Sequence, residues 1–219
     1  MNISYDSLFK ILTVSGINLQ FIKQRVRGMV EDYKVNTGRP DHEVSREVSR
    51  ALITKSVLKV GSISVVTSSS FAVPGLGSII GMLFAGAVDF LLILKEQVEL
   101  CYKIAAAYNV ELDTKELQAV SLAILGFSFT TGVVTQVGEI AIKKTIDNMA
   151  KRYIVKGIEE SSQEVAKAIL PRLLGRASRY IPLISIPVST SINVVSTLTV
   201  GKQAIEYFSN WKIERAEQP

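Results

Sequence analysis

The residue types that most often carry out catalysis are scarce in this chain. His42 is the only histidine, and it lies in a polar segment, so a histidine-based triad would depend on one solvated residue. Three Ser-x-x-Lys spacings occur, at Ser7–Lys10, Ser56–Lys59 and Ser209–Lys212. None is accompanied by the further motifs of the enzymes that use this pair. We therefore predict no catalytic residues and a protein that is not an enzyme.

The clustered glycines and the single cysteine also favour structural roles. Gly75, Gly77 and Gly81 have the spacing GxGxxxG, follow no credible strand and are not closed by Lys-Ser/Thr, unlike a phosphate-binding loop. A tight turn that leads into a packed helix explains them better. Cys101, as the only cysteine, excludes an internal disulfide and a cysteine metal cluster. In an apolar helix it is expected to be a small core residue. We predict no cofactor and no metal site.

Asp89 is the most unusual carboxylate, because it follows a long apolar stretch. An unpaired carboxylate in such surroundings would be costly, so Asp89 is expected to meet a basic partner, a polar cavity or an interface. We interpret it as a buried charge in a salt bridge between packed helices. A role in transport or proton handling is the alternative.

Basic residues border the apolar segments. Anionic lipid headgroups on the cytoplasmic face attract such residues by about 1 kcal/mol each. The alternative is an ordinary solvated helix face. Nucleic acid is not an expected partner, because the basic residues lack interleaved aromatics and a binding motif. The candidates for facing lipid are Arg46, Arg50, Lys55, Lys59, Lys143, Lys144, Arg172, Arg176 and Arg179.

The composition places these residues in a globular chain on the apolar side of average. The 219 residues are 47% hydrophobic and 21% charged, with a net charge of +5 and a mean hydropathy of +0.28. This length suffices for one large domain or two small ones with a substantial core. The first residues contain Asp6 and lack the basic leader and apolar core of a signal peptide. We therefore expect a protein that is not exported.

The first part of the chain predicts an amphipathic helix from residue 5 to about residue 35, because apolar residues recur there at helical spacing. The segment Asn36–Asp41 contains Gly38 and Pro40 and is the clearest loop. Asp41 is a plausible N-cap for a second helix that extends through Lys59.

A segment of 29 residues without a charge follows, from Val60 to Val88. Pro74–Gly77 interrupts it, and proline cannot continue a helix. We predict a helical hairpin whose second arm ends near Tyr108–Asn109. In that arm Glu99 and Lys103 are correctly oriented for an i,i+4 ion pair.

Two further uncharged segments of 22 residues each span Leu117–Gly138 and Tyr180–Gly201. Residues 139–179 between them predict two polar, charged helices, and the residues after Trp211 predict a frayed polar tail. Period-2 alternation flanked by hairpin turns is missing, so no sheet is expected. Gln, Ser and Thr residues dilute the first of these segments, and Pro182, Pro187, Asn193 and several Ser and Thr residues dilute the second. Neither is predicted to be a strong transmembrane helix.

A faint internal repeat aligns Pro182 with Pro74. Small residues recur every fourth position after each proline, which places them on one helix face and lets two backbones approach closely. Chance alignment is the alternative. The repeated positions are Gly77, Gly81 and Ala85 after the first proline, and Ser185, Ser189, Asn193, Thr197 and Gly201 after the second.

These features together resemble the EcsC family. The resemblance covers roughly residues 45–210 and is carried by Val73–Gly77, the leucine-rich stretch from Asp89 to Leu100, Ile104–Leu112 and the late segment from Arg179. Asn109 stands where that family usually has glycine, and it still permits the left-handed geometry of a helix end. The chain also resembles the helical domain appended to some Era-like GTPases. The resemblance implies a bacterial, membrane-associated helical protein without established catalytic residues.

We therefore predict an all-α protein, a helical bundle with long apolar hairpins joined by Pro/Gly turns. Residues 1–40 form an N-terminal helix and loop, 41–210 an EcsC-like helical domain and 211–219 a polar tail. The expected function is non-enzymatic contact with lipid or a membrane protein at the inner face of the cell membrane, in the cytoplasm. The alternative is a soluble helical interaction module that docks a protein partner such as a GTPase or a transporter subunit. A homo-oligomer of the chain is a further hypothesis about its partners. An enzyme built around Asp89 is a third hypothesis.

Overall fold

The computed structural model describes residues 17–70, 79–131, 139–177 and 185–216, and it contains helices but no strand within these ranges. This confirms the all-α prediction. The helices are α2 (Leu19–Thr37), α3 (Asp41–Ser70), α4 (Ile79–Ala107), α5 (Thr114–Thr131), α6 (Glu139–Lys156), α7 (Ile158–Ala177) and α8 (Ser185–Ala216).

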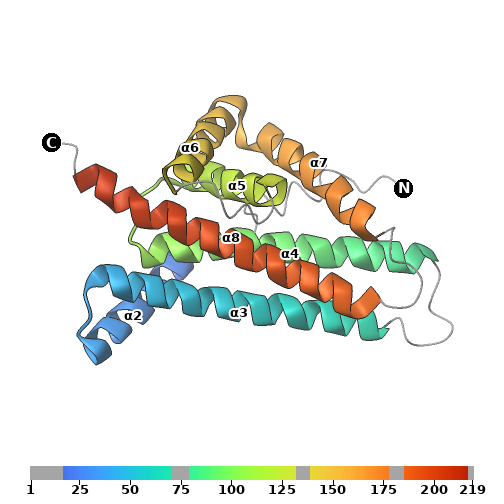
Figure 1. The fold of residues 1–219 in the computed structure, drawn as a ribbon, viewed down its shortest axis with the longest axis horizontal. Coiled ribbons are helices and arrows are strands. Elements are labelled where there is room, and N and C mark those ends of the chain that lie inside the picture. Colours follow the sequence, from blue (N-terminus) through green and yellow to red (C-terminus); the bar gives the residue numbers. More distant parts are fainter. Residues whose placement is uncertain (1–16, 71–78, 132–138, 178–184, 217–219) are drawn as a thin grey trace.

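The three longest helices form the centre of the molecule. Helices α3, α4 and α8 each pack against the other two, and α3 is antiparallel to both of its neighbours (Figure 1). Helix α2 packs against α3 and α4, while α5 packs against α4 and α8 and carries α6 and α7 on its other side. The core lies between these layers and includes the fully buried side chains of Leu94, Leu100, Ile104, Leu125 and Phe208.

Helix α2 is amphipathic, as predicted, and buries Ile22 and Val26. It begins after Asn18, whose side chain accepts a hydrogen bond from the amide of Phe21, and it ends at Gly38, whose φ of 62° is left-handed. The predicted loop therefore starts two residues later than expected. The part of the predicted helix before Ile17 lies outside the described residues.

Helix α3 starts at Asp41, one residue earlier than predicted. The carbonyl of Pro40 accepts hydrogen bonds from the amides of Glu43 and Val44, so Pro40 occupies the N-cap and the prediction of Asp41 as N-cap is wrong. Asp41 instead lies in the first turn, where a carboxylate is favoured by the helix dipole. It forms an ion pair of 2.7 Å with Lys34.

The end of α4 confirms the prediction for Asn109, which adopts a left-handed φ of 51°. The amide of Val110 donates to the carbonyl of Ala105 and the amide of Asn109 donates to that of Ala106. These are the two hydrogen bonds of a Schellman motif, which satisfies carbonyls that the helix end would leave open.

The remaining elements agree with the sequence except at the C-terminal end. Residues 139–177 form the two predicted helices α6 and α7, which meet at Gly157. Helix α8 continues past Trp211 to Ala216, so the first residues of the predicted frayed tail are helical. The turn residues Pro74, Gly75, Gly77 and Pro182 lie outside the described residues.

Candidate functional site: a cationic groove and an uncharged end

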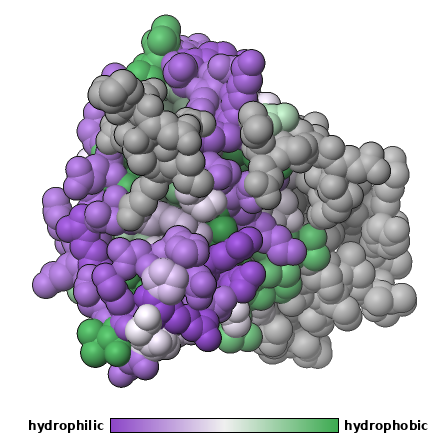
Figure 2. Space-filling model, turned by 60° about the vertical axis from the view of Figure 1, so that its left-hand side comes forward, coloured by the Kyte–Doolittle hydropathy of each residue, from purple (hydrophilic) through white to green (hydrophobic). Residues whose placement is uncertain are grey.

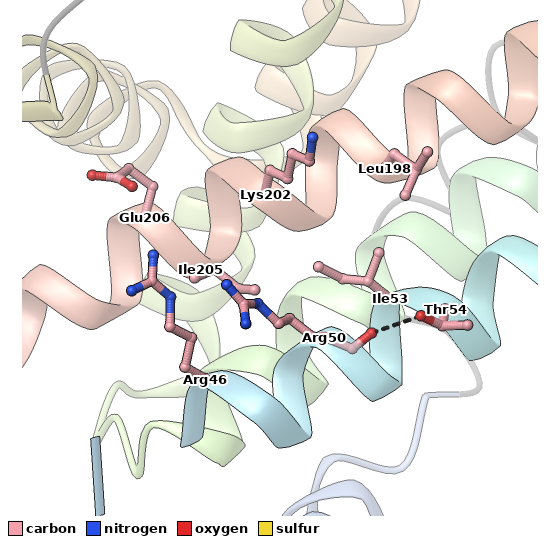
Figure 3. A pocket seen from close by; sticks show the side chains of 8 residues that line it. All are labelled: Arg46, Arg50, Ile53, Thr54, Leu198, Lys202, Ile205 and Glu206. Carbon is pink, nitrogen blue, oxygen red and sulfur yellow. Dashed lines mark hydrogen bonds between the residues drawn. The ribbon is translucent and has the colours of Figure 1, made fainter. Parts of the chain in front are cut away.

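A pocket of about 440 Å³ lies between α3 and α8. Both helices contribute residues from successive turns, because side chains three or four positions apart share one helix face. Figure 3 shows Arg46 and Arg50 reaching from α3 toward α8, with Glu206 beside Arg46 and Leu198 at the opposite end of the row. The lining residues are Arg46, Arg50, Ile53, Thr54, Leu198, Lys202, Ile205 and Glu206.

Cations outnumber carboxylates in this groove. Arg50 forms an ion pair of 2.7 Å with Glu47 on its own helix, and Glu206 is the only acidic residue in the lining. Neither Arg46 nor Lys202 forms an ion pair with any residue in the described part of the chain. Among the described residues, the groove therefore carries more positive than negative charge.

Tyr108 directly follows α4, and the charges of Arg46 and Arg50 influence its phenol group. Its hydroxyl is buried and has no hydrogen-bond partner in the described structure. Burial raises the pKa of the phenol, and the charges of Arg46 and Arg50 act in the opposite direction. A buried, unsatisfied hydroxyl costs about 1–3 kcal/mol, and Tyr108 itself does not line the pocket.

A buried ion pair lies farther along α3 and α4. The Glu96 side chain is 3% exposed; it accepts a hydrogen bond of 2.8 Å from Ser56, pairs with Lys59 and lies 3.4 Å from Lys103. Burial alone would raise the pKa of Glu96, but the hydrogen bond from Lys59, the charge of Lys103 and the hydrogen bond from Ser56 together hold that pKa below its usual value. The predicted ion pair of Glu99 with Lys103 is also present, at 3.2 Å.

Gln97, next to Glu96, extends these buried polar contacts to α8, and we call the whole set the polar layer. Gln97 is fully buried and donates hydrogen bonds to Ser196 at 3.0 Å and to Thr197 at 3.2 Å. The layer therefore crosses all three central helices near the middle of their length.

The layer marks a change in composition along these helices. Residues 60–70 of α3, 79–94 of α4 and 185–201 of α8 contain a single charged residue, Asp89. Figure 1 shows these three stretches at the same end of the molecule. We call this region the uncharged end. Asp89 lies in α4, but its side chain is outside the described part of the structure, so its predicted salt bridge stays a prediction.

Large apolar side chains are exposed where the uncharged end begins. Leu58 of α3 is 68% exposed, Leu92 of α4 is 43% exposed and Val195 of α8 is 49% exposed. By contrast, the face that Figure 2 brings forward is predominantly hydrophilic. In the part of the chain that the structure describes, no helix is both long and apolar enough to cross a bilayer.

The predicted basic residues do not form one surface. Arg46 and Arg50 share the groove, Lys55 and Lys144 are exposed on α3 and α6, and Lys59 belongs to the Glu96 cluster. Lys143 is buried at 7% exposure and lies 3.2 Å from Asp147, so its ammonium is not at the surface as predicted. Arg172 and Arg176 lie in α7 and Gly81 lies in α4, with side-chain surroundings that are not described, and Arg179 is outside the described residues.

Two functional candidates were missed by the sequence analysis. Lys202 follows the third uncharged segment directly, as its position in the sequence could have indicated. Glu96 lies seven residues after Asp89, two helical turns away on the same face, and could have been identified by that spacing.

Of the residues considered for catalysis, Ser56 and Lys59 both contact the buried Glu96, as described above. His42 is exposed at the start of α3, and Cys101 is buried, which raises the pKa of its thiol to about 12. Among the described residues, no group of three or more His, Cys, Asp or Glu side chains is placed to hold a metal ion.

Comparisons of the chain with protein-family models, with curated proteins and with solved structures found no match.

Proposed function

We propose that the protein is a non-enzymatic, membrane-associated helical protein that acts at the cytoplasmic face of a membrane through contact with lipid or with a membrane protein. The observation that carries the proposal is the uncharged end, in which three helices bring 60–70, 79–94 and 185–201 together with one charged residue. Charged side chains are costly in hydrocarbon, so a region without them is suited to contact a bilayer.

The lengths of the helices favour shallow insertion. The uncharged part of α3 has 11 residues, which span about 16 Å at the helical rise of about 1.5 Å per residue. A hydrocarbon core is about 30 Å thick, so the uncharged part of α3 is long enough to reach into one leaflet only. The exposed Leu58, Leu92 and Val195 would lie at the level of entry.

Basic residues next to the uncharged end supply attraction to anionic headgroups. Lys55 precedes it on α3, and Lys202 follows it on α8. This arrangement agrees with what the resemblance to the EcsC family implies, and that family assignment remains part of the proposal.

Vesicle flotation tests the proposal with charge substitutions at the exposed apolar positions. Leu58→Glu with Val195→Glu would place two carboxylates at the level of entry, and we expect the fraction of protein that floats with phosphatidylglycerol vesicles to fall at least about tenfold, because inserting a charge costs about 2.5–3.5 kcal/mol. The matched control is Val35→Glu with Val155→Glu, at positions 81% and 89% exposed on α2 and α6. Equal flotation of both double variants, or no flotation of the unaltered protein, would contradict the proposal.

A docking module is the second candidate, and the same exposed apolar residues favour it. Leu58, Leu92 and Val195 could pack against a protein partner or a second copy. Light scattering after size exclusion distinguishes the two functions: self-association that Leu58→Glu with Val195→Glu abolishes, without vesicle binding, would favour the module.

A further inference from the structure

The groove between α3 and α8 contains two rows of residues from antiparallel helices. Ile53 of α3 lies against Gly201 of α8, and this register places Arg50 across from the turn that contains Lys202. Arg46 lies one turn along, beside Glu206 (Figure 3). Three cations, Arg46, Arg50 and Lys202, thus line the groove with one carboxylate, Glu206, while Glu47 pairs with Arg50 from its own helix. An anion bound in the groove would offset this excess of positive charge.

We propose that this groove binds a phosphate group, held by Arg46 and Arg50 and covered by Lys202. Guanidinium groups present several N–H donors in a planar fork that matches phosphate oxygens, and Glu47 occupies only one nitrogen of Arg50. The Lys202 ammonium points away from the arginines in Figure 3, and its flexible stem can carry it over a bound anion.

The volume and the lining favour an organic phosphate with an apolar part. A pocket of about 440 Å³ is within the range of small-molecule sites and exceeds what one phosphate fills. Ile53, Leu198 and Ile205 supply apolar lining beside the cations.

The direction of the groove favours a phospholipid as the source of this phosphate. Leu198 is at the end of the groove nearest the uncharged end, whereas Arg46 and Glu206 are at the far end. A lipid that enters from the bilayer would place its headgroup on the arginines and its chains along Leu198. This orientation rests on the proposed function, whereas the phosphate site itself does not.

Isothermal titration calorimetry at low salt with two probes separates the sources. Dihexanoyl phosphatidate, kept below its critical micelle concentration, carries phosphate and short chains, whereas glycerol 3-phosphate carries the phosphate alone. We expect one phosphatidate per chain, bound at least about tenfold more tightly than glycerol 3-phosphate, since each buried methylene contributes about 0.8 kcal/mol. Equal affinity for the two probes would support the phosphate site and assign it to a soluble phosphate ester.

Substitutions test the residues. Arg46→Gln with Arg50→Gln should weaken binding of the tighter probe at least about tenfold, because hydrogen bonds to charged groups are lost. Lys202→Gln, at an exposed position that folding tolerates, should weaken it about threefold. The control Arg25→Gln with Arg39→Gln removes the same charge from exposed positions outside the groove and should leave binding unchanged.

Two results would overturn the phosphate site: no heat of binding for either probe, or an equal loss of affinity in the control pair. Vesicle flotation keeps this test separate from the proposed function. Flotation of the unaltered protein without binding of either probe would reject the groove and retain the membrane proposal. Binding of a probe without flotation would retain the phosphate site and reject the membrane proposal.

Discussion

At the scale of single residues, Glu96 is a buried carboxylate that links two of the central helices. Its side chain is 3% exposed and is held by Ser56, Lys59 and Lys103. Charges are buried at a large desolvation cost, and removing one member of a paired set leaves the others uncompensated. Ser56 and Lys59 belong to α3, so this cluster ties α3 to α4 where their uncharged parts begin.

Replacing Glu96 by Gln is expected to lower the free energy of unfolding by about 2–3 kcal/mol at pH 7, because hydrogen bonds to a charged group are lost. Urea denaturation followed by circular dichroism measures this. The control is Glu99→Gln, one turn away and 25% exposed, for which the loss should stay below about 1 kcal/mol. Similar losses of unfolding free energy in the two variants would show that the buried cluster stabilises the protein no more than the ion pair of Glu99 does.

The pH dependence of that difference has a definite sign. The pKa of Glu96 is lower in the folded protein than its ordinary value of 4.5, so the stabilisation is present above pH 4.5 and is lost as the pH falls through the folded pKa. The gap in stability between the unaltered protein and Glu96→Gln should therefore narrow in acid, below pH 4.5. A gap that stays constant from pH 7 to pH 3 would contradict this account.

At the scale of elements, α8 lies close against α3 and α4 at Gly201. A Cβ atom at this position would lie 2.5 Å from Cγ1 and 2.8 Å from Cδ1 of Ile53, and 3.3 Å from Leu100. Ile53 is buried and β-branched, so its side chain has little freedom to move away within a helix. The absence of a side chain at Gly201 therefore sets how closely the three central helices pack.

Gly201→Ala should destabilise the protein by about 1–3 kcal/mol, because overpacking exceeds the gain in helix propensity. Gly61→Ala is the matched control: Gly61 also lies within a helix, and a Cβ there would meet nothing within 4 Å, so a gain of up to about 1 kcal/mol is expected. In thermal unfolding, we expect Gly201→Ala to lower Tm and Gly61→Ala to leave it unchanged or raise it. A stabilised Gly201→Ala would mean that the helices adjust freely.

Local patterns predicted the elements well, and the contacts between distant elements poorly. The left-handed end of α4 at Asn109 follows from its residue type and the apolar periodicity before it. The cationic groove depends on α8 lying against α3, and no local pattern relates Lys202 to Arg50. Glu96 was overlooked in favour of Asp89 because periodicity identifies a face but not which of its members lies in the core.

At the scale of the whole molecule, charge and apolar surface are segregated along the central helices. The uncharged end holds one charged residue, Asp89, so all the basic residues behind the chain's net charge of +5 lie elsewhere, including the cations of the groove. Two kinds of attraction to a bilayer would therefore act in different places: a Coulomb attraction that salt screens and an apolar contact that salt does not weaken.

This segregation predicts a specific salt response in vesicle binding. With phosphatidylglycerol vesicles, raising the salt to about 1 M, where the screening length is about 3 Å, should weaken binding of the unaltered protein without abolishing it. The variant Leu58→Glu with Val195→Glu should be released completely, because only the Coulomb attraction remains to it. The reference is binding to neutral phosphatidylcholine vesicles, which should be weak and unaffected by salt. Complete release of the unaltered protein by salt would mean that the basic residues alone hold it at the surface and that the uncharged end does not enter the bilayer.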